Sequence, residues 1–166
     1  LWSGIRNGDI QVIATDHCPF SYEKEKIPMG KDDFSKCPNG SPGVETRIPI
    51  IFSEGVMKGR ISINKFVEVT STNPAKIFGM YPKKGSISIG SDADLVIIDK
   101  NKKVKVTKKL LHENVDYTPY EGMKVKGYPV MTIVRGKVIV KDNEFIGEEG
   151  YGKFIKRYKN DELVRF

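Results

Sequence analysis

The chain has 166 residues, of which 39% are hydrophobic and 30% charged, and its formal net charge is +7. This length supports one good hydrophobic core or two small ones. No apolar run approaches the roughly 20 residues that span a membrane, and the first residues lack a signal-peptide pattern. We therefore expect no membrane partner. The chain also begins without Met and in mid-pattern, so we expect a piece of a longer chain.

The cysteines and the positive charge are compatible with a cytoplasmic protein that binds no nucleic acid. Cys18 and Cys37 are too few for a disulfide framework and show no CxxC spacing, so we expect reduced thiols. Positive charge can indicate nucleic-acid binding, but lysines outnumber arginines 22 to 6. The lysines of residues 102–109 alternate in part with Val104 and Val106, which is typical of the wet face of a strand.

The first half of the chain predicts one strand, one long loop and several helices. Residues 10–15, IQVIAT, predict a short, largely buried strand of the kind found in parallel α/β sheets. Residues 19–43 have no periodicity, and irregular loops of this length are usually functional or disordered. Helical spacing returns over residues 44–58, where Gly59 is a natural stop and Pro49 predicts a kink or a late start.

Two more helices are predicted before the pattern changes. One covers residues 64–69. The other begins after Asn73 as its N-cap, with Pro74 at the first helical position and Gly79 after its end.

The second half reads as antiparallel sheet. Residues 85–106 and 128–146 show period-two alternation with turn residues, which is typical of strand pairs. We therefore predict an α/β part at residues 1–82, an antiparallel β part at 83–149, and a basic aromatic tail at 150–166 that packs on a neighbouring surface.

Asp16 is the first candidate for chemistry, because it ends the predicted strand just before the long loop. Catalytic residues of α/β sheets and barrels sit at the carboxyl ends of strands. A carboxylate there can bind a divalent metal or take a proton from metal-bound water, whereas a turn former or helix cap is the structural alternative. Strand side chains alternate, so Asp16, His17 and Cys18 converge on one metal only if the strand bends. We expect His17, and likewise His112, to serve hydrogen bonding or packing.

The loop motif CPNGSPGVETR, residues 37–47, is the second candidate. Asn39-Gly40 and Pro42-Gly43 predict consecutive tight turns that expose backbone N–H and C=O groups. Such a donor and acceptor pair suits a cyclic amide or imide, which offers the mirror pattern. An ordinary structured loop is the alternative.

Five segments in order carry a family resemblance: ATDHCPF, PNGSPGVETR, TSTNPAKIFGMYPKKGSISIGSDADLVIID, HENVDYTPYEGMKVKGYPV and RGKVIV. Together they resemble the carboxy-terminal third of the hydantoinase and dihydropyrimidinase family of the amidohydrolase superfamily. The resemblance implies an α/β fold: the carboxy-terminal part of a (β/α)8 TIM-type barrel plus the carboxy-terminal strands of a flanking β-sandwich. It also implies two zinc ions at the mouth of the barrel.

The resemblance assigns roles to particular residues. Asp16 matches the aspartate at the end of the last barrel strand, which is a zinc ligand and moves a proton from the bridging hydroxide to the leaving ring nitrogen. Asn39 matches the loop asparagine whose main chain holds the substrate ring. Cys18, Pro19 and Gly40 then shape the wall beside the substrate.

Most of the family's metal site is missing from the chain. A His-x-His pair, a carboxylated lysine and two further histidines are needed, but the chain has only two histidines and no such pair. One carboxylate cannot hold two zinc ions, so we expect this chain alone to be inactive. It would belong to a homo-oligomeric parent, dimer or tetramer, of roughly 450–500 residues, a length that divides into domains.

Four functions remain open at this point, one of them a stand-alone binding module that only the positive charge favours. The parent that the resemblance implies opens hydantoin or dihydropyrimidine rings to N-carbamoyl amino acids. An allantoinase or dihydroorotase is the enzymatic alternative, but dihydroorotate needs a cationic clamp and the motif offers only Arg47. A non-catalytic dihydropyrimidinase-related scaffold would have lost its metal ligands, and Asp16 argues against it.

Overall fold

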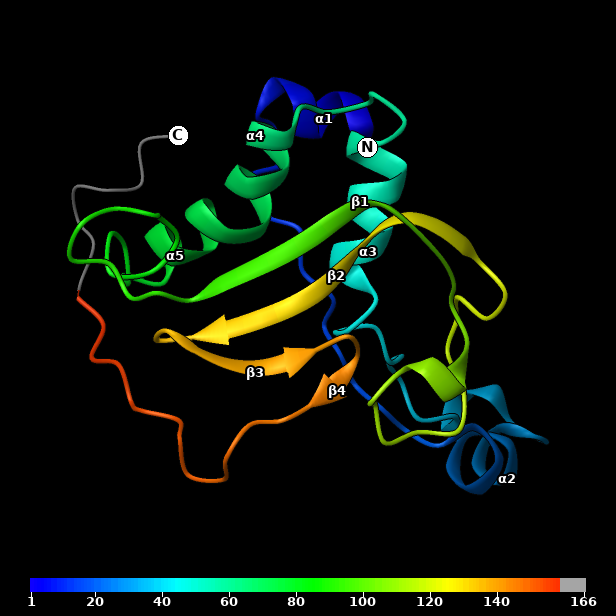
Figure 1. The fold of residues 1–166 in the computed structure, drawn as a ribbon. Helices are drawn as coiled ribbons and strands as arrows, with labels where there is room; N and C mark the ends of the chain where they lie inside the picture. Colours follow the sequence, from blue (N-terminus) through cyan, green and yellow to red (C-terminus); the bar gives the residue numbers. More distant parts are fainter. Residues whose placement is uncertain (159–166) are drawn as a thin grey trace.

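The computed structural model describes residues 1–158, with helices in the first half and an antiparallel sheet in the second (Figure 1). The helical elements are α1 (Trp2–Asn7), a π-helical turn (Tyr22–Lys26) that runs into α2 (Ile27–Gly30), a 3-10 turn (Phe34–Lys36), α3 (Arg47–Ile51) with its continuation (Phe52–Val56), α4 (Ile63–Val67) with its continuation (Glu68–Thr72), α5 (Asn73–Ile77), and a 3-10 turn (Lys108–Leu110). The strands are β1 (Leu95–Lys105), β2 (Lys124–Val134), β3 (Lys137–Lys141) and β4 (Glu144–Phe145). They pair antiparallel in the order β1-β2-β3-β4.

The helix predicted over residues 44–58 is confirmed, with the late start that Pro49 indicated. It begins at Arg47, so Pro49 is its third residue. The N–H of a residue in the first turn has no intrahelical acceptor, and proline loses nothing there. Gly59 follows the end of the helix at φ 66°, as expected of a helix stop.

The N-cap role predicted for Asn73 is wrong. Residues 63–77 are helical throughout, because Thr72 has helical backbone angles and the N–H of Asn73 bonds to the Glu68 carbonyl five residues earlier. This wide turn accommodates Pro74, which has no N–H to donate. The side chain of Asn73 is buried instead of capping the helix.

The strand predicted at residues 10–15 is also wrong, because the segment forms no ladder within the described residues. Its hydrogen bonds go to the helices: the Ile13 N–H donates to the Val69 carbonyl at 3.1 Å, and Asn73 Nδ2 donates to the Gln11 carbonyl at 2.9 Å. The Arg47 guanidinium donates to the Ile13 carbonyl at 2.6 Å. An apolar run becomes a strand only beside another strand, and residues 1–158 offer none here.

The predicted antiparallel sheet is confirmed, but its first strand is misplaced. Residues 85–89 form no strand, and Ile87 and Ile89 are exposed. Ion pairs from Lys83 and Lys84 to Asp92 and Asp94 close this stretch as a loop. The alternation was genuine, but β1 pairs with the distant β2 instead.

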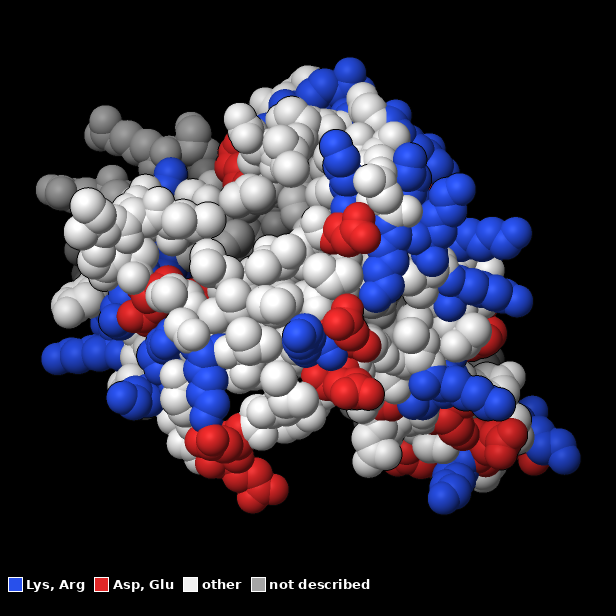
Figure 2. Space-filling view, in the orientation of Figure 1, with Lys and Arg blue, Asp and Glu red and all other residues white. Residues whose placement is uncertain are grey.

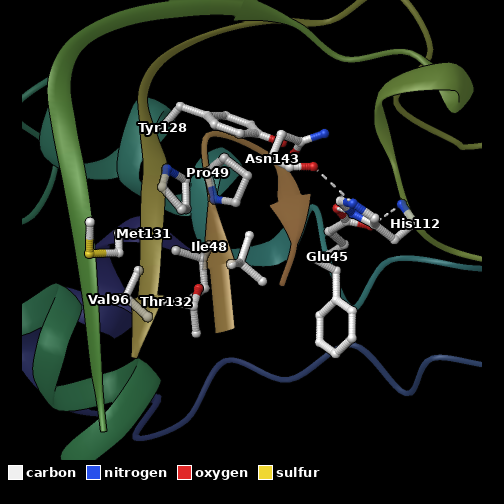
Figure 3. Close-up of a pocket in the computed structure, with 12 residues that line it drawn as sticks. Glu45, Ile48, Pro49, Val96, His112, Tyr128, Met131, Thr132 and Asn143 are labelled. Carbon is white, nitrogen blue, oxygen red and sulfur yellow. Dashed lines mark hydrogen bonds and ion pairs between the residues drawn. The ribbon is translucent and has the colours of Figure 1, made fainter. Parts of the chain in front are cut away.

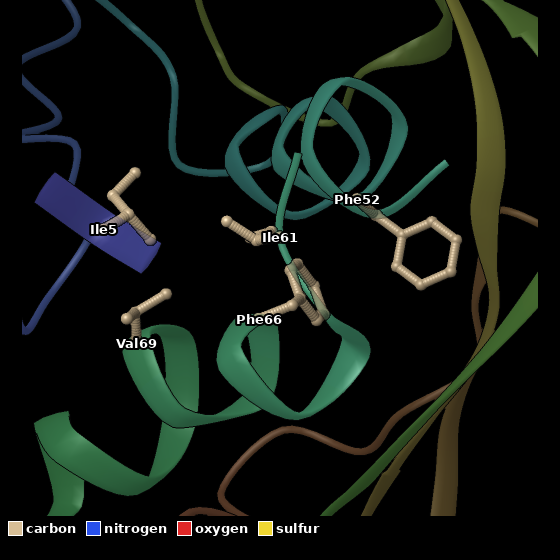
Figure 4. Close-up of a cluster of buried hydrophobic side chains, with 5 residues drawn as sticks. All are labelled: Ile5, Phe52, Ile61, Phe66 and Val69. Carbon is tan, nitrogen blue, oxygen red and sulfur yellow. The ribbon is translucent and has the colours of Figure 1, made fainter. Parts of the chain in front are cut away.

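The main core lies among the helices and reaches the sheet through Phe52. Five buried side chains meet in it (Figure 4): Ile5, Phe52, Ile61, Phe66 and Val69. The rings of Phe52 and Phe66 pack edge to face with centroids 5.4 Å apart. Phe52 also reaches β2 at Gly127, whose φ is 86°. A Cβ at Gly127 would overlap the Phe52 ring, so glycine is what lets the helix approach the sheet this closely.

Replacing Gly127 by alanine is therefore expected to destabilise the chain by about 2–4 kcal/mol, because it adds overpacking to the strain of a positive φ. Urea unfolding of the wild-type and variant chains measures the difference. Gly136 is the control, since it has a similar φ of 81° but open space around its Cβ position. Equal losses for Gly127→Ala and Gly136→Ala would show that the Phe52 contact contributes nothing.

The positive charge of the chain is visible on its surface. Figure 2 shows Lys and Arg gathered along one side of the face drawn, over the region where β1 ends and β2 begins in Figure 1. There Lys103 lies opposite Lys126 and Lys105 opposite Lys124.

No helix among residues 1–158 has the length and apolar character of a membrane span.

The described part of the tail runs back along this same chain. The Arg135 guanidinium stacks 4.3 Å from the Tyr151 ring centre, and the Tyr158 N–H donates to the Gly79 carbonyl at 3.1 Å. Residues 159–166 of the predicted tail lie outside the described residues.

Candidate functional site

Asp16 lies where the chain turns sharply into the 19–43 loop. Its φ is 47°, a left-handed conformation that aspartate tolerates better than most residues. The bend breaks the strand alternation that would have pointed Asp16 and His17 to opposite faces. The Asp16 side chain is exposed, and its carboxylate has no hydrogen bond or ion pair with any other described residue. It is therefore free to take a ligand or a proton.

The end of the loop returns to Asp16 and lies against the residues that follow it. Ser41 forms an isolated parallel bridge with His17, and its carbonyl accepts the Cys18 N–H at 3.2 Å. Gly40 has a φ of 107°, and a Cβ on it would overlap Cys18 Cβ. The structure thus brings together Cys18 and Gly40, two of the three predicted wall residues. Pro19, the third, and Asn39, the predicted main-chain contact to the substrate, are exposed beside them in the chain.

His17 fixes the same loop by hydrogen bonding, as predicted. Its Nδ1 accepts the N–H groups of Gly43 at 3.0 Å and Val44 at 3.3 Å. An accepting Nδ1 carries no proton, so the ring proton is on Nε2. The Glu113 carboxylate comes within 3.8 Å of that same Nδ1. This approach is not an ion pair, because the atom that faces the carboxylate has no proton to share.

Sequence reasoning missed the acidic side chains that hold the loop from the β part. The Asp116 carboxylate accepts the Ser21 hydroxyl at 2.8 Å and the N–H groups of Tyr22 at 2.7 Å and Glu23 at 2.9 Å. These bonds, the one from Glu23 first, lower the pKa of Asp116 to about 2. The stabilisation is thus present above the ordinary pKa of 3.8 and lost only as pH falls through about 2. Ser21 and Asp116 are 95 residues apart, and no local sequence pattern predicts a contact over that separation.

His112 and Glu45 form a second link between the two parts. Glu45 accepts the His112 N–H and faces its Nδ1, both at 2.7 Å, while His112 Nε2 lies 3.0 Å from the Asn143 carbonyl. Acceptors therefore face both ring nitrogens. The hydrogen bond to Glu45 is the main reason that the pKa of His112 is raised above 6.5.

We therefore expect the His112 ring to titrate above pH 6.5, which NMR of the ring protons measures. The stabilisation from the His112–Glu45 pair is fully present below the pKa of His112 in the unfolded chain, and it is lost as pH rises through the raised pKa of His112 in the folded chain. Glu45→Gln removes the charge and should bring the midpoint back toward 6.5. A wild-type midpoint at or below 6.5 would contradict the pairing.

A groove of about 570 Å³ opens between α3 and the sheet, beside this link (Figure 3). Apolar side chains such as Ile48, Val96 and Met131 line most of it, and the His112–Glu45 pair lies at its edge. The groove offers mainly apolar contact. Nowhere among residues 1–158 do three or more His, Cys, Asp or Glu side chains gather as a metal site. Asp16 can supply one ligand and no more.

Comparison with known proteins gives this arrangement its context. The Amidohydrolase family profile matches residues 1–139. The chain belongs to the amidohydrolase family. It is 47% identical over 164 residues to D-hydantoinase from Geobacillus stearothermophilus, covering 99% of this chain and 35% of that protein. It is 49% identical over 157 residues to D-phenylhydantoinase from Escherichia coli O1:K1, covering 95% of this chain and 34% of that protein.

The solved structures of such proteins have the same α/β fold over this region. A D-hydantoinase crystal structure matches with a TM-score of 0.91 at 48% identity, over 95% of this chain and 34% of that one. The dihydropyrimidinase of Brevibacillus agri NCHU1002 matches with a TM-score of 0.91 at 47% identity, over 94% and 34%. The resemblance to hydantoinase and dihydropyrimidinase is thereby confirmed. This amidohydrolase chain spans about a third of the length of these relatives.

Proposed function

We propose that this chain is part of a metal-dependent hydrolase that opens cyclic amide rings of the hydantoin or dihydropyrimidine type to N-carbamoyl amino acids. One observation carries the proposal: the free carboxylate of Asp16 lies next to a wall made by Cys18 and Gly40, in a chain similar to hydantoinases throughout. Taken alone, residues 1–166 are inactive in this proposal. They supply one metal ligand and one side of the substrate site.

The proposed whole has a (β/α)8 barrel and a flanking β-sandwich, to which this chain gives the carboxy-terminal parts of both. It is cytoplasmic and assembles as a dimer or tetramer. The similarity to solved hydantoinase chains about three times as long supports a larger unit.

Zinc fits Asp16 as one ligand within a larger set. The carboxylate is exposed and unpaired among the described residues, and carboxylate oxygen is an accepted zinc ligand. Catalytic zinc sites use three protein ligands, so the others must come from elsewhere in the protein. When bound, zinc acidifies water and so provides a nucleophile at neutral pH. We propose two ions per subunit.

The residues of this chain then have defined tasks. Asp16 takes the proton that the attacking water loses and gives it to the ring nitrogen, because an amide leaves readily only when its nitrogen is protonated. The main chain at Asn39 and Gly40 donates to and accepts from the ring amide. Cys18 and Pro19 limit the room beside it and exclude water.

The substrate class follows in part from Arg47. A dihydroorotase needs a cation for the substrate carboxylate, but the Arg47 guanidinium lies half-buried and bonds to the Ile13 carbonyl. Burial also lowers its pKa. This supports an uncharged ring over dihydroorotate. The scaffold alternative would leave Asp16 as a carboxylate without a task.

Metal analysis and hydrolysis of hydantoin and dihydrouracil, on this chain and on the full-length protein side by side, test the proposal. We expect about two zinc ions per subunit and turnover in the full-length protein, as hydrolytic two-metal sites require. The isolated chain should show neither. A full-length protein without metal and turnover would favour the scaffold function, and hydrolysis of dihydroorotate alone would favour a dihydroorotase.

A further inference from the structure

We propose that residues 112–117, which belong to the connection between β1 and β2, position the 19–43 loop against Asp16 and thereby set how tightly the site holds its substrate. The inference rests on the proposed function, because it assumes that this loop contacts the substrate. It adds positioning residues that lie far from the site in sequence and touch no reacting atom.

The first contact of this segment is with the beginning of the loop. Asp116 receives three hydrogen bonds from Ser21, Tyr22 and Glu23, where the helical turn of residues 22–26 begins. The free N–H groups of a helix start need acceptors, and a carboxylate is the strongest that a side chain offers. The ring of Tyr117 lies 5.7 Å from that of Tyr22 and covers the same junction.

The second contact is with the end of the loop. Glu113, whose side chain is only 3% exposed, accepts the Glu45 N–H at 3.1 Å. The Glu45 carboxylate in turn binds His112, so the two parts are tied in both directions. The Oε2 atom of Glu113 has no partner among the described residues. Burying a carboxylate oxygen without a donor costs free energy, which the packing around Glu113 must offset.

The segment itself is anchored in the sheet part. Leu111, just before it, is buried in a second apolar cluster with Val106, Val125 and Tyr128. Asn143, in the turn between β3 and β4, donates from Nδ2 to the Leu110 carbonyl at 2.8 Å. Lys108 Nζ donates to the Glu113 carbonyl at 2.6 Å. Residues 112–117 can therefore act as a fixed support for a loop whose regular structure consists of short helical turns.

Loosening this support should weaken substrate binding without changing the chemical step. Asp16 is not among the residues that Asp116 holds, and Ile13, close to Asp16 in the chain, is fixed by Val69 and Arg47. The loop wall contacts the substrate equally in the ground state and the transition state. Loss of such uniform binding raises KM and leaves kcat unchanged.

The test is Asp116→Asn in the full-length hydrolase, with steady-state kinetics on hydantoin and amide hydrogen exchange of residues 20–43. An amide side chain cannot accept all three hydrogen bonds. We expect KM to rise by about tenfold, the loss of roughly one charge-assisted hydrogen bond, with kcat unchanged and faster exchange at Tyr22 and Glu23. Asp99→Asn is the matched control, since Asp99 is a sheet aspartate whose carboxylate, among residues 1–158, accepts a hydrogen bond only from the nearby Asn101 N–H. It should change neither quantity.

Ser21→Ala provides a second, milder variant that removes one donor from Asp116 and should give a smaller rise in KM. An active wild-type enzyme whose Asp116→Asn variant keeps its KM would overturn the positioning role and leave the proposed function intact. So would a fall in kcat at unchanged KM. A wild-type protein that hydrolyses no cyclic amide would overturn the proposed function, and the positioning role with it.

Discussion

Asp16→Asn in the full-length hydrolase is expected to lower kcat by roughly 10³-fold or more, the usual contribution of a positioned acid–base group. Asparagine is the informative replacement, because it accepts a φ of 47° as well as aspartate does and keeps the size of the side chain. It cannot carry a proton to the leaving nitrogen. Asp16→Ala removes the metal ligand as well and adds backbone strain. Steady-state hydrolysis assays and zinc analysis measure both effects.

Asp9→Asn is the control for Asp16, since Asp9 is an exposed aspartate just before the same irregular segment. It should retain wild-type kinetics. Circular dichroism should be unchanged in all three variants, because neither side chain contributes to the core. Wild-type turnover in Asp16→Asn would remove Asp16 from the mechanism.

Gly40→Val is expected to lower kcat/KM by roughly 10²-fold, the effect of displacing a substrate contact by about 1 Å. Valine cannot adopt a φ of 107° without strain, and its Cβ would overlap Cys18 Cβ. The loop must therefore move away from the residues that follow Asp16. Kinetics of hydantoin hydrolysis by the full-length protein measure the loss.

Two controls separate the loop geometry from general strain. Asn39→Ala keeps the main chain and should be the milder change, because the asparagine is proposed to hold the substrate through its backbone. Gly90→Val imposes similar strain at a φ of 89° with open space around the Cβ position, and should leave kcat/KM unaltered. Equal effects of Asn39→Ala and Gly40→Val would reject a main-chain contact.

Local sequence patterns predicted the elements whose cause is local. Pro49 and Gly59 set the limits of their helix through their own backbone preferences. The alternating valines and lysines of β1 predicted a strand with one wet face. The same patterns failed at residues 10–15 and 85–89, because a strand also needs a partner, and alternation does not say where the partner is. The N-cap prediction for Asn73 failed for a related reason. An asparagine side chain can cap a helix or bond to a distant backbone group, and here Asn73 donates to the Gln11 carbonyl instead.

The sequence by itself determined the family, through five ordered motifs, and it singled out Asp16 and the Asn39-Gly40 turn as candidates. Tertiary structure decided how the loop is held. Cys18 meets Gly40, His17 accepts the N–H groups of Gly43 and Val44, and Asp116 reaches the start of the loop from the other half of the chain. The physical reason is that a backbone N–H group is the same at every non-proline residue and bonds to any acceptor at the right distance and direction. The sequence therefore does not show which acidic side chain will accept the N–H groups of the loop.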